Sequence, residues 1–164
     1  MKLRSTIASQ PNGAILSDDR RYRYVLWRDV PSIDGCRALL FVGLNPSTAD
    51  ESENDPTIRR CMGFAERWGY SRLLMVNLFA YRATKPKVLH DELDPVGPEN
   101  NRWLRQAIDV ADFTLAAWGN NGLWGDRHEQ VKAMLKDPHC LGRTKKHAPR
   151  HPLYVPRNQD AIPF

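Results

Sequence analysis

The stretch Arg37-Ala38-Leu39-Leu40-Phe41-Val42-Gly43-Leu44-Asn45-Pro46-Ser47-Thr48 joins an apolar run of strand length to a polar turn. A run of this kind is typical of a buried central strand in a parallel sheet. In open α/β sheets, ligands bind in the crevice beyond the carboxyl ends of such strands. The turn at residues 43–48 is therefore the first place where we expect a functional site.

Apolar runs and helical periodicity around this stretch predict the remaining elements of one domain, residues 1–164. Two short segments flanking the turn at 18–21 predict an N-terminal β-hairpin, preceded by a polar arm or edge strand at 1–13. We expect a three-layer α/β/α sandwich with a four-stranded, mainly parallel sheet and the hairpin at its edge. The other strands are expected at 72–77, 113–118 and 140–143, and the helices at 55–69, 99–111 and 124–135.

The composition excludes several classes of protein. With 41% hydrophobic residues, the 164-residue chain can fill one core, and no apolar run is long enough to span a bilayer. The three cysteines show no close pairing and no signal peptide is visible, so we expect a cytoplasmic protein with reduced thiols. We expect a monomer.

No motif for a metal or cofactor is visible. His139, Cys140, His147 and His151 do not match a regular zinc pattern and lack a second thiolate. The chain contains neither a Walker A loop nor a G-x-G-x-x-G turn. We therefore predict a protein that works without a metal or a cofactor.

Polar side chains follow each predicted core strand. Asn45, Asn77 and Asn120 come directly after three apolar strands, and His151 follows the fourth. An unsatisfied polar group at a buried strand end costs about 1–3 kcal/mol, so such positions do not collect amides by chance. For Asn45, Asn77 and His151 together we expect a ligand site, whereas Asn120 is equally explained as a turn residue.

The formal net charge of +5 is compatible with a polyanionic partner, and much of the charge lies near the C-terminus. Arg143, Lys145, Lys146 and Arg150 fall in a segment that has no acidic residue before Asp160. Such a run is either a solvated basic loop or a surface that contacts phosphates.

The polar motifs, taken in order, resemble those of the uracil-DNA glycosylase superfamily. They are Gly43-Leu44-Asn45-Pro46-Ser47, Leu73-Leu74-Met75-Val76-Asn77, Ala117-Trp118-Gly119-Asn120 and His151-Pro152. The first is similar to the G-x-N-P form of the mismatch-specific branch. The chain from Ala14 onward is also similar to an uncharacterised bacterial and phage family, domain-of-unknown-function family 1643, which carries G-L-N-P-S-T-A and R-H-P-L-Y.

The glycosylase resemblance implies a role for each matching residue. Asn45 would hold the attacking water, Asn77 would read the pyrimidine edge, and His151 would donate a hydrogen bond to the base oxygen O2. Phe79 or Tyr81 would stack on a flipped base. Phosphates would contact Arg143, Lys145, Lys146 and Arg150. The residues expected to contact substrate are Gly43, Leu44, Pro46, Ser47, Asn77, Phe79, Tyr81, Arg82, Asn120 and Tyr154.

Two departures from the glycosylase pattern affect the expected chemistry. Asn45 stands where efficient branches have Asp, and Asn cannot take a proton, so we expect slow chemistry unless Asp50 or Asp55 approaches the site. Leu153-Tyr154 replaces the Ser-Pro that follows His-Pro in the superfamily, so the wedge that opens a duplex is not recognisable in the sequence. Tyr154 is either an intercalating residue or a core aromatic.

These patterns predict an enzyme that hydrolyses the N-glycosidic bond of uracil or a modified base in nucleic acid, most simply DNA. Two alternatives remain open. One is a non-catalytic nucleic-acid or nucleobase-binding module on the same scaffold, and the other is an enzyme acting on a free nucleotide.

Overall fold

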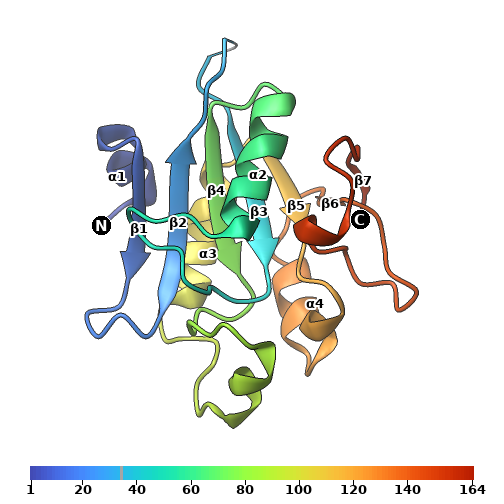
Figure 1. The fold of residues 1–164 in the computed structure, drawn as a ribbon. Coiled ribbons are helices and arrows are strands. Elements are labelled where there is room, and N and C mark those ends of the chain that lie inside the picture. The colour runs from blue at the N-terminus through green and yellow to red at the C-terminus, as the bar shows by residue number, and fades with distance from the viewer. Residues whose placement is uncertain (34) are drawn as a thin grey trace.

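A single sheet of seven strands organises the molecule (Figure 1). The computed structural model describes residues 1–33 and 35–164. The strands lie side by side in the order β1-β2-β4-β3-β5-β6-β7. In chain order the elements are α1 (Leu3–Ser9), β1 (Asn12–Leu16), β2 (Arg23–Asp29), β3 (Ala38–Gly43), α2 (Pro56–Arg67), β4 (Arg72–Asn77), the 3₁₀ turn η1 (Pro86–Asp91), α3 (Asn100–Val110), β5 (Phe113–Ala116), η2 (Asn120–Leu123), α4 (Arg127–Lys132), β6 (His139–Cys140), η3 (Pro152–Tyr154) and β7 (Ile162–Pro163).

The mixed α/β class is confirmed, but the prediction of a four-stranded, mainly parallel sheet is wrong. β4, β3, β5 and β6 are parallel, while β1, β2 and β7 add three antiparallel pairings. The predicted hairpin forms as β1 and β2, and β2 then pairs with β4, for example through Leu26 and Met75. Six of the seven β2 residues are buried, so this strand needs a neighbour on each side and becomes part of the sheet interior.

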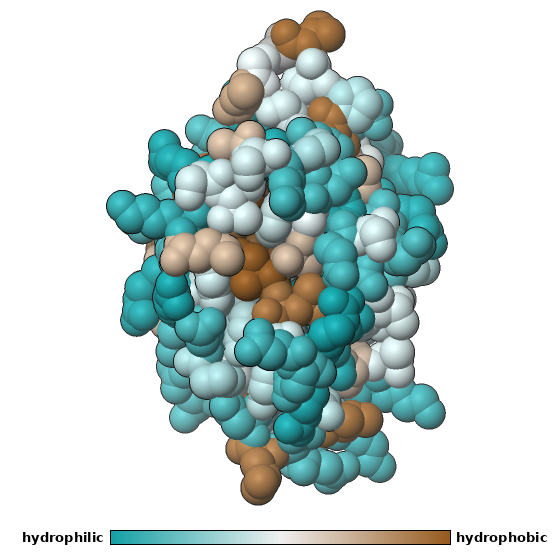
Figure 2. All heavy atoms as spheres, turned by 90° about the vertical axis from the view of Figure 1, so that its left-hand side faces the viewer, coloured by the Kyte–Doolittle hydropathy of each residue, from teal (hydrophilic) through white to brown (hydrophobic). Residues whose placement is uncertain are grey.

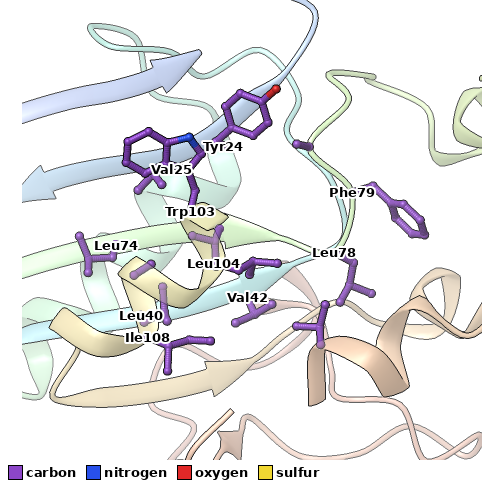
Figure 3. Packing of buried hydrophobic residues seen from close by; sticks show 14 of the residues in the cluster. Tyr24, Val25, Leu40, Val42, Leu74, Leu78, Phe79, Trp103, Leu104 and Ile108 are labelled. Carbon is purple, nitrogen blue, oxygen red and sulfur yellow. The ribbon is translucent and has the colours of Figure 1, made fainter. Parts of the chain in front are cut away.

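Helices cover both faces of the sheet, which gives three layers. α2 packs on one face with Ile58 and Phe64, against the odd-numbered apolar residues of β3. α3 packs on the other face, and Figure 3 shows Leu104 and Ile108 close to Leu40 of β3. The two faces therefore have separate apolar clusters, and β3 contributes alternate side chains to each of them.

The first residues form a helix, so the predicted polar arm or edge strand at 1–13 is wrong for most of its length. Leu3 and Ile7 are the buried residues of α1, four positions apart on one face. The backbone N–H of Leu3 donates to Gln106 Oε1 of α3 at 2.8 Å. Two apolar residues are too few to produce a clear helical pattern, and the helix depends on its packing against α3.

The other helices follow the predicted pattern with shorter ends. α2 begins at Pro56 directly after Asp55, as the Asp-Pro signal predicts. α3 matches the expected helix to within one residue at each end. The predicted helix at 124–135 is reduced to α4, and its predicted first turn is interrupted at Gly125, whose φ of 63° is not helical.

The surface at the β1 side of the sheet is mostly hydrophilic. Figure 2 shows this side, with apolar atoms gathered near its centre and at its two ends. Among the described residues, no helix is long and apolar enough to cross a membrane.

Candidate functional site

A cavity of about 670 Å³ lies at the carboxyl ends of the parallel strands β3, β4 and β5. The segment after β3 leads to α2 on one face, whereas the segment after β5 leads to α4 on the other. Two neighbouring parallel strands whose connections diverge in this way leave a crevice at their carboxyl ends. The polar turn at residues 43–48 forms one wall of this cavity.

Four polar side chains from different segments line this one cavity. Asn45 follows β3, Asn77 ends β4, Asp55 precedes α2, and His151 precedes η3. They are separated by up to 106 positions in the sequence, and the parallel strands bring them to the same edge of the sheet.

Asn77 lies in close contact with the glycine that ends the neighbouring strand. Gly43 and Asn77 are partners across β3 and β4, and a Cβ at position 43 would lie 2.8 Å from Asn77 Oδ1. The side chain is 3% exposed, and its Nδ2 has no hydrogen-bond partner among the described residues. A buried amide without a partner is rare in folded proteins and is a favourable place for a ligand to bind.

Asn45 is fixed by the backbone around it. Its Nδ2 donates to the carbonyl oxygens of Pro46 and Ala83 at 2.9 and 2.8 Å. Both N–H groups are therefore used, and the carbonyl Oδ1 is left as a hydrogen-bond acceptor. Asn45 can orient a water molecule through Oδ1, but it cannot remove a proton from it.

Asp55 brings a carboxylate to the cavity and caps α2 at the same time. Its Oδ1 accepts a hydrogen bond from the backbone N–H of Ile58 at 2.8 Å. Within residues 1–33 and 35–164, Oδ2 has no hydrogen bond or ion pair. One carboxylate oxygen is thus structural, and the other is available to a ligand or a water molecule.

His151 presents a hydrogen-bond donor. Its Nδ1 accepts from the backbone N–H of Leu153 at 3.2 Å, so the neutral ring carries its proton on Nε2. Burial lowers the pKa of His151, and the nearby Asp55 opposes this shift only in part. The imidazole is therefore neutral at pH 7 and can donate from Nε2.

Arg23 also lines the cavity, and the sequence analysis did not identify it. It begins β2 and is 2% exposed, and its Nη1 donates to the carbonyl oxygen of Ala49 at 2.9 Å. Burial lowers its pKa to about 10. The available signal was an arginine directly before the apolar run at residues 24–27, a position where a charge needs a specific reason.

The residues predicted to contact substrate fall into two groups. Gly43, Leu44, Ser47, Asn77, Asn120 and Tyr154 line the cavity, whereas Pro46, Phe79, Tyr81 and Arg82 do not. Tyr154 is 80% exposed at the rim and is not a core residue. Its ring lies 5.4 Å from that of His151.

The residues outside the cavity have other contacts. The Phe79 ring packs 5.5 Å from that of Trp124, and Tyr81 meets Tyr22 edge-on at 5.8 Å. Arg82 reaches the carbonyl oxygens of Ser47 and Thr48 and lines a shallower neighbouring hollow.

The two candidate carboxylates also differ in position. Asp50 accepts hydrogen bonds from the backbone N–H groups of Ser52 and Glu53 and lies 3.6 Å from the Arg20 guanidinium. It is absent from the cavity wall, so Asp55 is the carboxylate that the fold places beside Asn45 and Asn77.

The basic segment borders the cavity through one of its members. Arg150 lines it, while Lys145 and Lys146 are exposed and Arg143 lies over the Phe164 ring at 5.4 Å. Thr144 donates to Asn120 Oδ1 at 2.6 Å and so joins this segment to the loop after β5.

The fold and this cavity define an α/β protein with a polar cavity at the carboxyl edge of its parallel strands. Residues 23–153 match a family model described as protein of unknown function (DUF1643), and the chain belongs to that family. Searches against curated proteins and against solved structures found no match for the chain.

Proposed function

We propose that this protein hydrolyses the N-glycosidic bond of uracil or a modified base in nucleic acid, with the base held in the cavity. The observation that supports this proposal is the shared location of Asn45, Asp55, Asn77 and His151, each of which keeps an unused hydrogen-bonding group. The motif resemblance to uracil-DNA glycosylases assigns three of these residues to the same chemistry.

Base recognition falls to Asn77 and His151. A carboxamide presents one acceptor and one donor side by side, which matches the carbonyl and adjacent N–H of a uracil-like base. The Nε2–H of His151 donates to the second carbonyl oxygen of the base. When the C1′–N bond breaks, its electron pair stays with the base, and this donor stabilises the resulting anion.

The water that completes the hydrolysis is handled by Asn45 and Asp55. Oδ1 of Asn45 accepts a hydrogen bond from the water and orients it. As the water oxygen bonds to C1′, Oδ2 of Asp55 takes the released proton. Asp55 thus supplies the general base that the first motif lacks at Asn45.

A substitution of Asp55 that preserves the helix cap tests this mechanism. Asn caps helices as well as Asp, so Asp55→Asn is expected to remain folded. Loss of a general base lowers a rate by about 100-fold or more, and alkali-labile sites in oligonucleotides containing uracil or modified bases measure that rate. His151→Ala is expected to lose activity as well.

The absence of base release by the wild type across a broad panel of modified bases would falsify the proposal. Full activity of folded Asp55→Asn would remove Asp55 from the mechanism.

A nucleobase-binding module without catalysis is the second candidate. It is favoured by Asn45, whose amide nitrogen is fully used by two carbonyl oxygens and which offers no carboxylate. Salt-dependent binding of DNA or RNA without base release, by wild type and Asp55→Asn alike, would identify this function.

A further inference from the structure

Arg23 lines the cavity with most of its donors unused. Its guanidinium is buried, yet only Nη1 makes a hydrogen bond, to the carbonyl oxygen of Ala49. Its Nε is a buried donor without a partner, and in the described part of the chain Arg23 forms no ion pair. A buried charge without a partner is strongly unfavourable, so the burial of Arg23 needs a specific reason.

A second buried arginine of the same strand shows what a purely structural role looks like. Arg28 is also 2% exposed, but its guanidinium donates five hydrogen bonds and holds the loop before α2 in place. Its acceptors are Asn54 Oδ1 and the carbonyl oxygens of Gly13, Trp27, Asp50 and Glu53. Arg23 supports the same loop with one hydrogen bond and faces the cavity, which Arg28 does not.

The order of the strands places Arg23 relative to the other site residues. β2 lies next to β4, which carries Asn77, whereas His151 lies close to Gly119, which follows β5 on the opposite side of β3. A ligand that contacts both His151 and Asn77 therefore extends toward Arg23. The cavity of about 670 Å³ lies within the range of about 300–1,000 Å³ that binds whole small ligands, so it has room for more than a base.

We propose that Arg23 binds a phosphate group of the ligand inside the cavity. A guanidinium pairs with phosphate through two parallel N–H donors, and the free Nε and Nη2 of Arg23 supply such a pair. The first turn of α2 lines the same cavity through Thr57 and Ile58, and helix N-termini favour anions. This inference rests on the proposed function of the cavity as a nucleobase pocket.

Asp55 is the acidic group that acts most strongly on Arg23, and a bound phosphate has to compete with it. Removing the Asp55 charge is therefore expected to tighten phosphate binding while it abolishes base release. Opposite effects of one substitution on binding and on chemistry separate this inference from the proposed function.

Calorimetric titration with deoxyuridine and deoxyuridine 5′-monophosphate tests the inference. We expect wild type to bind the monophosphate at least tenfold more tightly than the nucleoside, and Arg23→Gln to reduce this ratio to near one. Arg23→Lys keeps the charge but loses the fork, so an intermediate ratio is expected. Arg105→Gln removes an exposed charge on α3 and is expected to leave the ratio unchanged.

Two short oligonucleotides, with and without a 5′-phosphate, distinguish the source of the phosphate. If Arg23 binds a terminal phosphate, Arg23→Gln lowers the affinity for the 5′-phosphorylated oligonucleotide only. If Arg23 binds an internal phosphate of the strand, the affinity for both oligonucleotides falls equally. Equal binding of nucleoside and monophosphate by wild type would overturn the inference. A phosphate preference that survives in folded Arg23→Gln would overturn it too.

Base release is measured separately on the same preparations. A phosphate preference that depends on Arg23, without any base release, leaves this inference standing and removes the proposed function. Base release without a phosphate preference supports the proposed function and overturns this inference.

Discussion

At the scale of single residues, the close contact between Gly43 and Asn77 restricts which residue can stand at position 43. The side chain of Asn77 lies against Gly43, and a Cβ at position 43 would clash with its Oδ1 at 2.8 Å. The backbone of Gly43 needs no left-handed conformation, so glycine is required there by the close approach and not by φ. The end of strand β3 thus shapes the group that we propose reads the base.

Gly43→Ala is expected to weaken ligand binding more than it weakens the fold. The new methyl group clashes with the end of a side chain that can rotate, so the stability cost should be about 1 kcal/mol, the usual size for single substitutions. The rotated Asn77 no longer faces the base, so deoxyuridine affinity should fall at least tenfold. Urea unfolding and calorimetric titration measure the two effects.

Gly63→Ala is the matched control for this prediction. Gly63 is exposed inside α2, and a Cβ there would meet no atom within 4 Å. This variant should gain about 0.5–1 kcal/mol of stability from helix propensity and bind deoxyuridine like wild type. Unchanged binding in Gly43→Ala would show that the position of Asn77 is unimportant.

Sequence reasoning at this scale reached the residues that carry motifs. Asn45 and Asn77 follow recognisable apolar runs, so their convergence on one sheet edge follows from strand order and direction, whereas His151 was reached through its His-Pro motif. Arg23 has no motif, and its importance depends on which of its donors find partners after folding. Which hydrogen-bond donors of a side chain find partners depends on the tertiary structure and cannot be predicted from a local sequence pattern.

At the scale of elements, the segment between β3 and α2 is held by arginine side chains, of which Arg28 is buried. Arg28 donates to Asp50, Glu53 and Asn54, and Arg82 reaches Ser47 and Thr48. This irregular segment presents its carbonyl oxygens to arginines because it has no sheet or helix partners to satisfy them. The position of Asp55 at the start of α2 depends on this support.

Arg28→Met is expected to lower the free energy of unfolding by about 3 kcal/mol, since it leaves several buried acceptors without donors. Urea denaturation monitored by tryptophan fluorescence measures the change. Arg105→Met, on the exposed face of α3, should stay within about 0.5 kcal/mol of wild type. Similar stabilities for the two variants would contradict the supporting role of Arg28.

Element prediction succeeded where periodicity is long and failed where elements are short. α2 and α3 have apolar stripes over three turns and appear close to their expected bounds. α1, β6 and β7 have seven, two and two residues, and each exists only because it packs or pairs with a distant segment. The free energy that stabilises these short elements comes from tertiary contacts, which local sequence patterns do not reveal.

At the scale of the whole molecule, positive charge borders the cavity on the side of η3. Arg150 lines the cavity, and Lys145 and Lys146 extend the basic segment outward into solvent. If a nucleic-acid strand places a base in the cavity, its flanking phosphates pass over this segment. Each phosphate that is neutralised releases condensed counterions, so the salt dependence of binding reports on these contacts.

The double variant Lys145→Gln/Lys146→Gln is expected to reduce the slope of log affinity against log salt concentration. Loss of two phosphate contacts on single-stranded DNA should lower the slope by about 1.4, at about 0.7 per phosphate. Arg4→Gln/Arg105→Gln removes the same net charge from exposed positions on α1 and α3 and should keep the wild-type slope. Fluorescence anisotropy at several salt concentrations measures all three proteins. Equal reductions in both double variants would mean that net charge, and not this segment, attracts the strand.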